Sequence, residues 1–251
     1  MTIGIVAEGP RDHDIIEEIA DMLYPGSKYR PLQPEPVATE GSTYSGYKGV
    51  WQWCMKSKSI VDDLRRIPSH NIDLYIIHMD GDTTREKNVH CTDASKCTAS
   101  SAAYCRESFN ECPLNIDNAF SESTIEEKIQ FLHDKIVSWL TADILGRIVF
   151  CLPFDSHESW IVAAFDKDSL GDPELLVKPA DNIIARSAQY HSIRVTRSDG
   201  KLKKTELLYK SHFIPAICSN WEYIVATCKS AKHFKCSLEA GMHRHQQPTL
   251  A

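Results

Sequence analysis

Residues 3–12 read IGIVAEGPRD, and residues 74–82 read LYIIHMDGD. Each stretch begins with a short apolar run, which predicts a buried strand, and each continues into acidic residues. The acids are Glu8 and Asp12 in the first stretch and Asp80 and Asp82 in the second. Open α/β folds bind their ligands at the carboxyl ends of parallel strands. If the two strands are neighbours, Glu8, Asp80 and Asp82 should meet at one edge of a parallel sheet.

The rest of the chain alternates between helical and strand patterns. Apolar residues at helical spacing predict helices over about residues 15–23, 51–66 and 125–140, the last with a capping box at Ser123-Thr124-Ile125-Glu126. A strand at Ile148 to Leu152 precedes a helix that has Glu158 in its first turn, and further helices are expected around residues 214–228 and 231–238. This alternation predicts an α/β fold with a mostly parallel sheet, helices on both faces and a helical C-terminal segment.

Composition predicts a folded globular protein. The chain has 251 residues, of which 42% are hydrophobic and 25% charged, both ordinary values. No stretch approaches the roughly 20 apolar residues of a membrane span, and acids interrupt the N-terminus where a signal peptide has its apolar core. We therefore expect a cytoplasmic protein with no membrane contact. In that reducing compartment its nine cysteines are expected to be free thiols or metal ligands.

Charge is divided unevenly along the chain. The net charge is −6, but residues 1–184 carry 17 basic and 30 acidic side chains, whereas residues 185–251 carry 11 basic and 4 acidic ones. We take residues 1–184 as the core and 185–251 as a basic C-terminal segment. An acidic body beside a basic segment suits a metal site next to a surface that attracts phosphates, and an ordinary solvated surface explains the basic segment equally well.

The spacing of the acids suits a divalent metal. Side chains at positions i and i+2 of an extended segment point the same way, so Asp80 and Asp82 can converge on one ion while Glu8 reaches it from the neighbouring strand. Magnesium prefers a few carboxylate oxygens together with water and phosphate. The alternative is that Glu8 and Asp12 cap a helix and that residues 80–82 form a simple turn. Each motif alone favours that alternative, and their joint placement favours the metal.

Residues 83–120 are polar and lack periodicity, which predicts a long insertion after the acidic turn. This insertion contains His90 and four cysteines: Cys91, Cys97, Cys105 and Cys112. Such a set can bind zinc tetrahedrally, and a metal would hold a polar loop together. The insertion has no Cys-x-x-Cys pair, so scattered thiols are the favoured alternative.

The motif Glu-Gly-x-x-Asp after the first strand, with Asp-x-Asp after a later one, resembles the Toprim domain of topoisomerases, primases and overcoming-lysogenisation-defect nucleases. Residues 152–160, LPFDSHESW, and the lysine-rich tail are similar to small stand-alone Toprim-like proteins that are often encoded near phage-defence genes. The resemblance implies a Toprim-like fold with Glu8 as an acid/base or metal-binding group. It makes Asp80 and Asp82 metal ligands and Glu158 a further acid. The insertion at 83–120 has no counterpart in that family.

These observations lead to three functional hypotheses. The first is a nuclease, in antiphage defence, that hydrolyses DNA or RNA with Mg²⁺ or Mn²⁺ held by Glu8, Asp80, Asp82 and Glu158. In it Glu8, Asp80 and Asp82 are catalytic together with a lysine that supplies positive charge, taken as Lys204, with Lys203 and Lys210 as alternatives. The second is a non-catalytic Toprim-like partner of another component, such as an ATPase, in a defence complex. The third is a phosphatase or phosphotransferase that uses Asp80 in the Asp-x-Asp motif. Oligomerisation stays open in all three.

Overall fold

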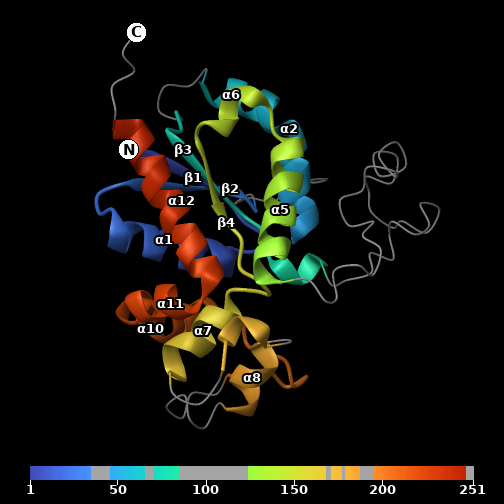
Figure 1. Cartoon of the computed structure of the whole chain (residues 1–251), viewed down its shortest axis with the longest axis vertical. Helices are drawn as coiled ribbons and strands as arrows, with labels where there is room; N and C mark the ends of the chain where they lie inside the picture. The colour runs from blue at the N-terminus through green and yellow to red at the C-terminus, as the bar shows by residue number, and fades with distance from the viewer. Residues whose placement is uncertain are drawn as a thin grey trace, which may run out of the picture.

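The computed structural model describes residues 1–34, 46–65, 71–84, 124–167, 171–176, 179–186 and 195–246. Its centre is a four-stranded, all-parallel sheet in the order β2-β1-β3-β4. The strands are β1 (Thr2–Val6), β2 (Lys28–Gln33), β3 (Leu74–His78) and β4 (Ile148–Cys151). Helices lie on either side of this sheet (Figure 1), which confirms the predicted α/β class.

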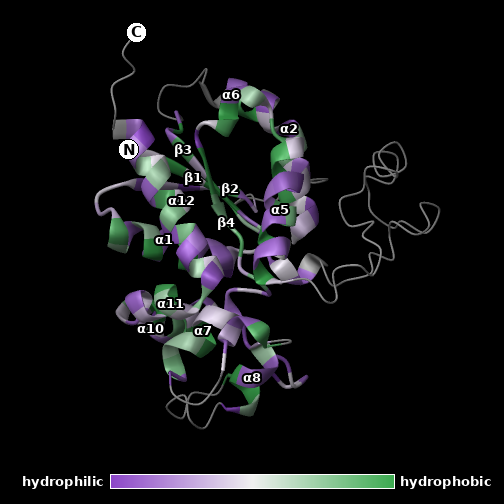
Figure 2. Cartoon of the chain, viewed as in Figure 1, coloured by the Kyte–Doolittle hydropathy of each residue, from purple (hydrophilic) through white to green (hydrophobic). Residues whose placement is uncertain are grey.

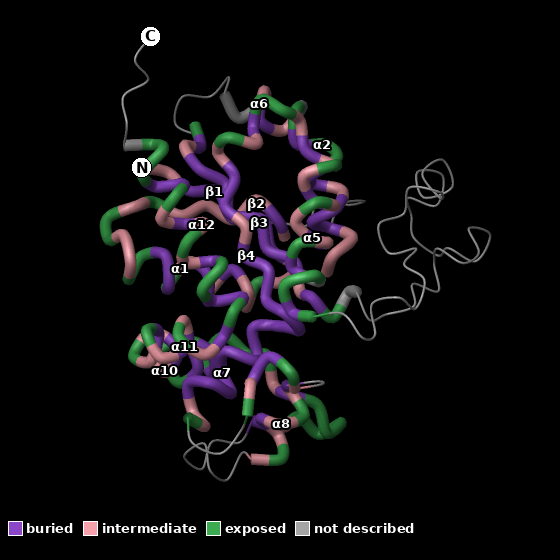
Figure 3. Tube along the Cα trace, in the orientation of Figure 1, coloured by how far each residue is buried: buried purple, intermediate pink, exposed green. Residues whose placement is uncertain are grey.

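The two strands that precede the acidic motifs are direct neighbours. β1 and β3 pair in parallel, with Ile3 opposite Leu74 and Val6 opposite Ile77. The segments that follow β1 and β3 therefore leave the sheet at the same edge, as the sequence predicted. All five residues of β3 are buried, and the strands stand out as the buried centre in Figure 3.

Alternate side chains of the strands supply two separate apolar cores. On one face, Ile3, Ile5 and Ile76 pack with α1 (Pro10–Leu23), α7 (Glu158–Phe165) and the C-terminal helices. On the other face, Tyr75 and Ile77 pack with α2 (Tyr47–Arg65) and α5 (Ile125–Trp139). In Figure 2 these helices carry both hydrophobic and hydrophilic residues, as expected of helices with one buried face. The prediction of helices on both faces is thus confirmed.

The capping box of α5 lies one residue later than predicted. Thr124 is the residue before the helix, and its hydroxyl accepts from the backbone N–H of Glu127 at 3.2 Å. In return, the Glu127 carboxylate accepts from the backbone N–H of Thr124 at 2.7 Å. The prediction that placed the box at residues 123–126 was wrong because two Ser/Thr-x-x-Glu patterns overlap here, and only the helix start selects between them.

The C-terminal segment is helical, as predicted, and belongs to the sheet's covering layer. It contains α9 (Glu206–Leu208), a π-helical turn (Tyr209–Phe213), α10 (Ile214–Ser219), α11 (Trp221–Thr227) and α12 (Lys229–Gln246). Helix α12 crosses so close to the sheet that a Cβ on Gly241 would lie 2.7 Å from the Val149 side chain. The buried Glu174 carboxylate caps the start of α12, accepting from the backbone N–H groups of Lys229 and Ser230.

Shorter elements complete the described chain: a 3₁₀ turn at Gly81–Thr84, α6 (Ala142–Leu145), a 3₁₀ turn at Pro173–Leu175 and α8 (Pro179–Ala185). No described helix is long and apolar enough to span a membrane. Residues 85–120 of the predicted insertion, with Cys91, Cys97, Cys105 and Cys112, lie outside the described residues. The zinc hypothesis therefore stays a prediction.

Candidate metal centre

The first predicted acids meet where β1 and β3 end. The backbone N–H of Asp80 donates to the Glu8 carboxylate, with 2.8 Å between nitrogen and Oε1. The backbone carbonyl of Glu8 accepts from the N–H of Gly46, also at 2.8 Å, which holds the turn after β1. Glu8 and Asp80, 72 residues apart in the sequence, are therefore in direct contact.

Asp82 is positioned by the loop that follows β4. The N–H of Gly81 donates to the carbonyl of Pro153 and the N–H of Asp82 donates to the carbonyl of Asp155, both at 2.9 Å. The approach is so close that a Cβ on Gly81 would lie 1.8 Å from the carbonyl oxygen of Phe154. The Asp-x-Asp turn therefore requires glycine at its centre. It brings Asp155, an acid that the sequence argument did not use, to the same pocket as Asp80 and Asp82.

Burial raises the pKa values of two of these acids. Burial raises the pKa of Glu8 well above its ordinary value, and the neighbouring carboxylate of Asp80 adds to this. Burial likewise raises the pKa of Asp80, although contact with His78 opposes the shift. Both shifts mean that concentrated negative charge is unfavourable here without a counterion. A set of carboxylate oxygens is also the donor set that Mg²⁺ and Mn²⁺ prefer, so the residues fit such an ion.

A second group of possible ligands lies directly behind the acids. The His78 ring stacks on the His157 ring with 4.4 Å between centroids, and both side chains are at most 1% exposed. His78 Nε2 lies 3.1 Å from Asp80 Oδ1, and His157 Nδ1 lies 3.3 Å from Asp12 Oδ1. Ligand atoms of Asp12, His78 and His157 all lie within 4.8 Å of one another. This buried Asp/His/His cluster could therefore bind a metal ion.

The cluster has its own electrostatic balance. Burial acts to raise the pKa of Asp12, but the hydrogen bond with His157 and the charge of His78 lower it to about 2. Burial acts to lower the pKa of His78, but the negative charges of Asp80 and Asp12 outweigh it, so this pKa is raised. Burial and the neighbouring His78 lower the pKa of His157. Sequence reasoning used Asp12 as a possible helix cap and as the last residue of the Toprim-like motif, and it passed over both histidines. The available signal was a histidine ending an apolar strand and another preceding Glu158.

The predicted lysine and the fourth predicted acid form an ion pair. Lys204 Nζ lies 2.7 Å from Glu158 Oε1, and the Tyr209 hydroxyl donates to the same oxygen at 3.1 Å. Burial acts to raise the pKa of Glu158, but Lys204 lowers it, and Glu158 in turn raises the pKa of Lys204. Of the two alternative lysines, Lys210 pairs with Glu206 at 2.8 Å on the exposed surface of a helix, and Lys203 does not line the pocket described next.

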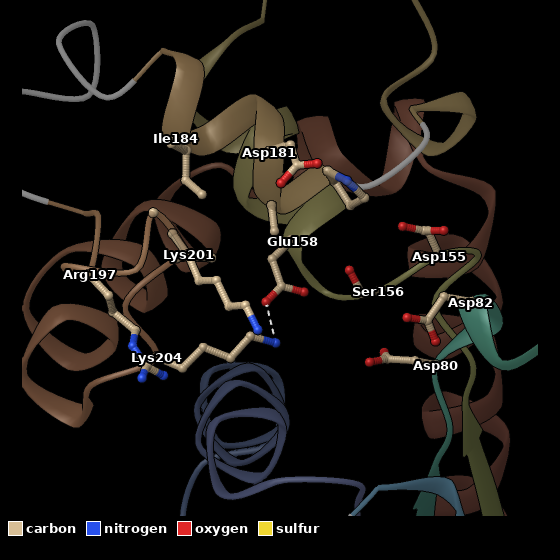
Figure 4. A pocket seen from close by; sticks show the side chains of 14 residues that line it. Asp80, Asp82, Asp155, Ser156, Glu158, Asp181, Ile184, Arg197, Lys201 and Lys204 are labelled. Atoms are coloured by element: carbon tan, nitrogen blue, oxygen red, sulfur yellow. Dashed lines mark ion pairs between the residues drawn. The ribbon is translucent and has the colours of Figure 1, made fainter. Parts of the chain in front are cut away.

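A pocket of about 790 Å³ is lined by the three aspartates at the sheet edge and by the ion pair of Glu158 with Lys204. Figure 4 shows Asp80, Asp82 and Asp155 on one side and Arg197, Lys201 and Lys204 on the other, with Glu158 between them. The structure thus brings four of the five predicted site residues to one cavity: Asp80, Asp82, Glu158 and Lys204. The fifth, Glu8, is not among the lining residues and lies against the backbone of Asp80. Their roles as catalytic residues and metal ligands remain predictions.

Comparison of the chain with protein-family models, with curated proteins and with solved structures finds no match. The structure establishes a parallel, four-stranded α/β fold, and the resemblance to Toprim domains rests on the motif residues alone.

Proposed function

We propose that this protein is a nuclease that hydrolyses phosphodiester bonds of DNA or RNA with Mg²⁺ or Mn²⁺. The observation that carries the proposal is the two-sided charge of the pocket, in which three carboxylates face three basic side chains across the cavity. A phosphodiester bound there would have a cation-binding surface on one side and fixed positive charge on the other. Phosphoryl transfer is catalysed mainly by positioning and by such neutralisation of charge.

The metal ligands in this proposal are Glu8, Asp80 and Asp82, with Asp155 beside them. The contact of Glu8 with Asp80 and the raised pKa values of both acids support this assignment. A divalent cation supplies two effects there: it neutralises charge on phosphate oxygens and makes bound water more acidic. His78, whose Nε2 contacts Asp80, orients the Asp80 carboxylate, as groups behind metal ligands commonly do.

Lys204 is proposed to bind a phosphate oxygen and to stabilise the negative charge that develops on it. Glu158 raises the pKa of Lys204, so the ammonium stays protonated at neutral pH and acts as a fixed charge. Glu158 is then a positioning residue, because its Oε1 holds Lys204 and is itself held by the Tyr209 hydroxyl. This differs from the metal-ligand role that the nuclease hypothesis predicted for Glu158, and metal affinity separates the two roles. Glu158→Gln should leave Mn²⁺ affinity unchanged if Glu158 positions the lysine and weaken it if Glu158 is a ligand.

Cleavage assays with purified protein test the proposal. Single-stranded DNA, duplex DNA and RNA are incubated with Mg²⁺, with Mn²⁺ or with EDTA. We expect cleavage that requires the metal, its loss in Asp80→Asn, and a lower kcat with unchanged Mn²⁺ affinity in Lys204→Met. Lys203→Met is the matched control and should keep wild-type activity. No cleavage of any nucleic acid by the wild-type protein would overturn the proposal.

The two other hypotheses give different results in related experiments. A phosphotransferase that uses Asp80 as its nucleophile would form an acyl phosphate on that residue, which alkali and hydroxylamine cleave and which hydrolysis by activated water does not produce. A non-catalytic partner would show no Mn²⁺-dependent activity alone. A role in antiphage defence, alongside a component such as an ATPase, follows only from the resemblance, and we include it in the proposal. Phage plating on cells that express wild-type protein or Asp80→Asn tests that role.

A further inference from the structure

The pocket has a third wall that neither the metal nor the phosphate would use. Three of its apolar residues, Pro179, Ala180 and Ile184, come from α8. The fourth is Leu202, which pairs with Thr196 in an isolated antiparallel β-bridge. Figure 4 shows the Ile184 side chain pointing toward the cavity, with the Asp181 carboxylate near it on the same helix. An apolar wall in a pocket of charged groups indicates a ligand that is only partly charged.

The size of the pocket limits what can enter it. The volume lies within the range of about 300–1,000 Å³ that holds small ligands. A cavity of this size suits one nucleotide separated from its neighbours.

The lining residues offer a contact to each part of a nucleotide. A phosphate suits the space between the metal-binding acids and Lys204, with Lys201 and Arg197 nearby. The flat, apolar face of a base suits Ile184 and Leu202, since burial of such a face is favourable. A sugar hydroxyl or a base N–H would find an acceptor in the exposed Asp181 carboxylate.

We infer that this pocket binds one nucleotide unit taken out of its stack, with its phosphate at the acids and its base against the wall of Ile184 and Leu202. The inference rests on the proposed function and names its substrate class: unpaired nucleic acid, with cleavage next to the captured nucleotide. Enzymes that act on a single base likewise draw it out of the helix or use a single strand.

Matched oligonucleotides test the inference. One is a labelled single strand, the second has the same sequence with one abasic position, and the third is the same strand within a duplex. Removal of the base should reduce cleavage at that position about tenfold, the factor expected from exposing roughly 55 Å² of apolar surface. The duplex should be cut at least as slowly as the abasic strand. Binding of each oligonucleotide is measured separately by fluorescence anisotropy.

A pair of variants on α8 provides the protein-side control. Ile184→Glu places a charge on the wall, whereas Ala185→Glu adds the same charge to an exposed position of the same helix that does not line the pocket. Ile184→Glu should weaken single-strand binding about tenfold and Ala185→Glu should not. Equal thermal midpoints establish that both variants fold. If Ile184→Glu does not fold, Ile184→Ser is used in its place.

The outcomes separate the inference from the proposed function. Equal cleavage of the intact strand, the abasic strand and the duplex overturns the inference and leaves the nuclease standing. Absence of cleavage, with single-strand binding that Ile184→Glu weakens and Ala185→Glu does not, supports the pocket and overturns the nuclease. Absence of both cleavage and binding overturns both. Dephosphorylation of a nucleoside 5′-monophosphate, without cleavage of strands, would overturn both, because the ligand of the pocket would then be a free nucleotide.

Discussion

Replacement of Lys204 by Met tests the ion pair at the centre of the pocket. The substitution removes the ammonium that lies 2.7 Å from Glu158 Oε1. It leaves Glu158, which is 4% exposed, with the hydrogen bond that the Tyr209 hydroxyl donates to the same oxygen. Loss of one partner from a fully buried pair costs about 3–5 kcal/mol, whereas an exposed pair is worth about 0–1 kcal/mol. Because the Lys204 side chain is 55% exposed, solvent screens the pair. We expect a loss of about 1–2 kcal/mol in the free energy of unfolding at pH 7.

The pH dependence of this loss has a definite sign. The pKa of Glu158 is lowered in the folded protein, because Lys204 outweighs the opposing effect of burial. A carboxylate with a lowered folded-state pKa contributes stability above its unfolded pKa, about 4.3 for Glu. That contribution is lost as the pH falls through the folded-state pKa. The difference in the free energy of unfolding between wild type and Lys204→Met should therefore have its largest value at pH 7 and decrease below about pH 4.

Urea unfolding at pH 7 and at successively lower pH values measures the effect. Lys203→Met is the control for loss of a neighbouring lysine, and Glu158→Gln with the double variant completes a double-mutant cycle. The pair should show a coupling free energy of about 1 kcal/mol at pH 7. A Lys204→Met protein as stable as Lys203→Met at pH 7 would refute this reasoning, and so would a loss that stays constant as the pH falls.

Two further predictions concern the turn after β3 and the histidine behind the acids. Gly81→Ala should lower the free energy of unfolding by at least about 3 kcal/mol, because its Cβ would overlap the Phe154 carbonyl. Gly146→Ala, whose Cβ meets nothing within 4 Å, is the control, and equal urea midpoints would contradict the packing. His78→Gln should weaken Mn²⁺ binding about 10- to 100-fold in calorimetry, because it removes the ring that contacts Asp80. His133→Gln on α5 should keep wild-type affinity, and an unchanged affinity in His78→Gln would rule out the orienting role.

Local patterns in the sequence were sufficient to predict much of the fold. The apolar runs before Glu8 and Asp80 identified β1 and β3, and helical spacing identified α1, α5 and α7. The adjacency of β1 and β3 followed from a general rule about parallel sheets, because ligand sites gather where such strands end. Their pairing in the structure confirms that expectation.

Contacts between distant segments could not be predicted from these patterns. The stacking of His78 on His157 depends on the register between β3 and β4, in which His78 lies opposite Cys151. The same register brings Asp155 to Asp82. A hydrophobic run indicates that its residues are buried, but it does not indicate which polar side chain lies opposite a given residue. The ion pair of Lys204 with Glu158 is of the same kind, since the sequence offered three lysines without a means to choose among them.

Thermal unfolding of wild type and Glu8→Gln, in EDTA and in excess Mn²⁺, tests the central claim that the acids at the sheet edge hold a divalent cation. Burial and Asp80 raise the pKa of Glu8, so its ionised form destabilises the metal-free protein at neutral pH. A glutamine keeps an oxygen to accept from the Asp80 N–H, so Glu8→Gln should melt higher than wild type in EDTA. Mn²⁺ at 100 times its Kd stabilises a protein that binds it by about 2.7 kcal/mol. The wild-type midpoint should therefore rise by about 5–10 °C, and the midpoint of Glu8→Gln should stay unchanged. A wild-type midpoint that does not respond to Mn²⁺, or an equal rise in both proteins, would contradict the claim.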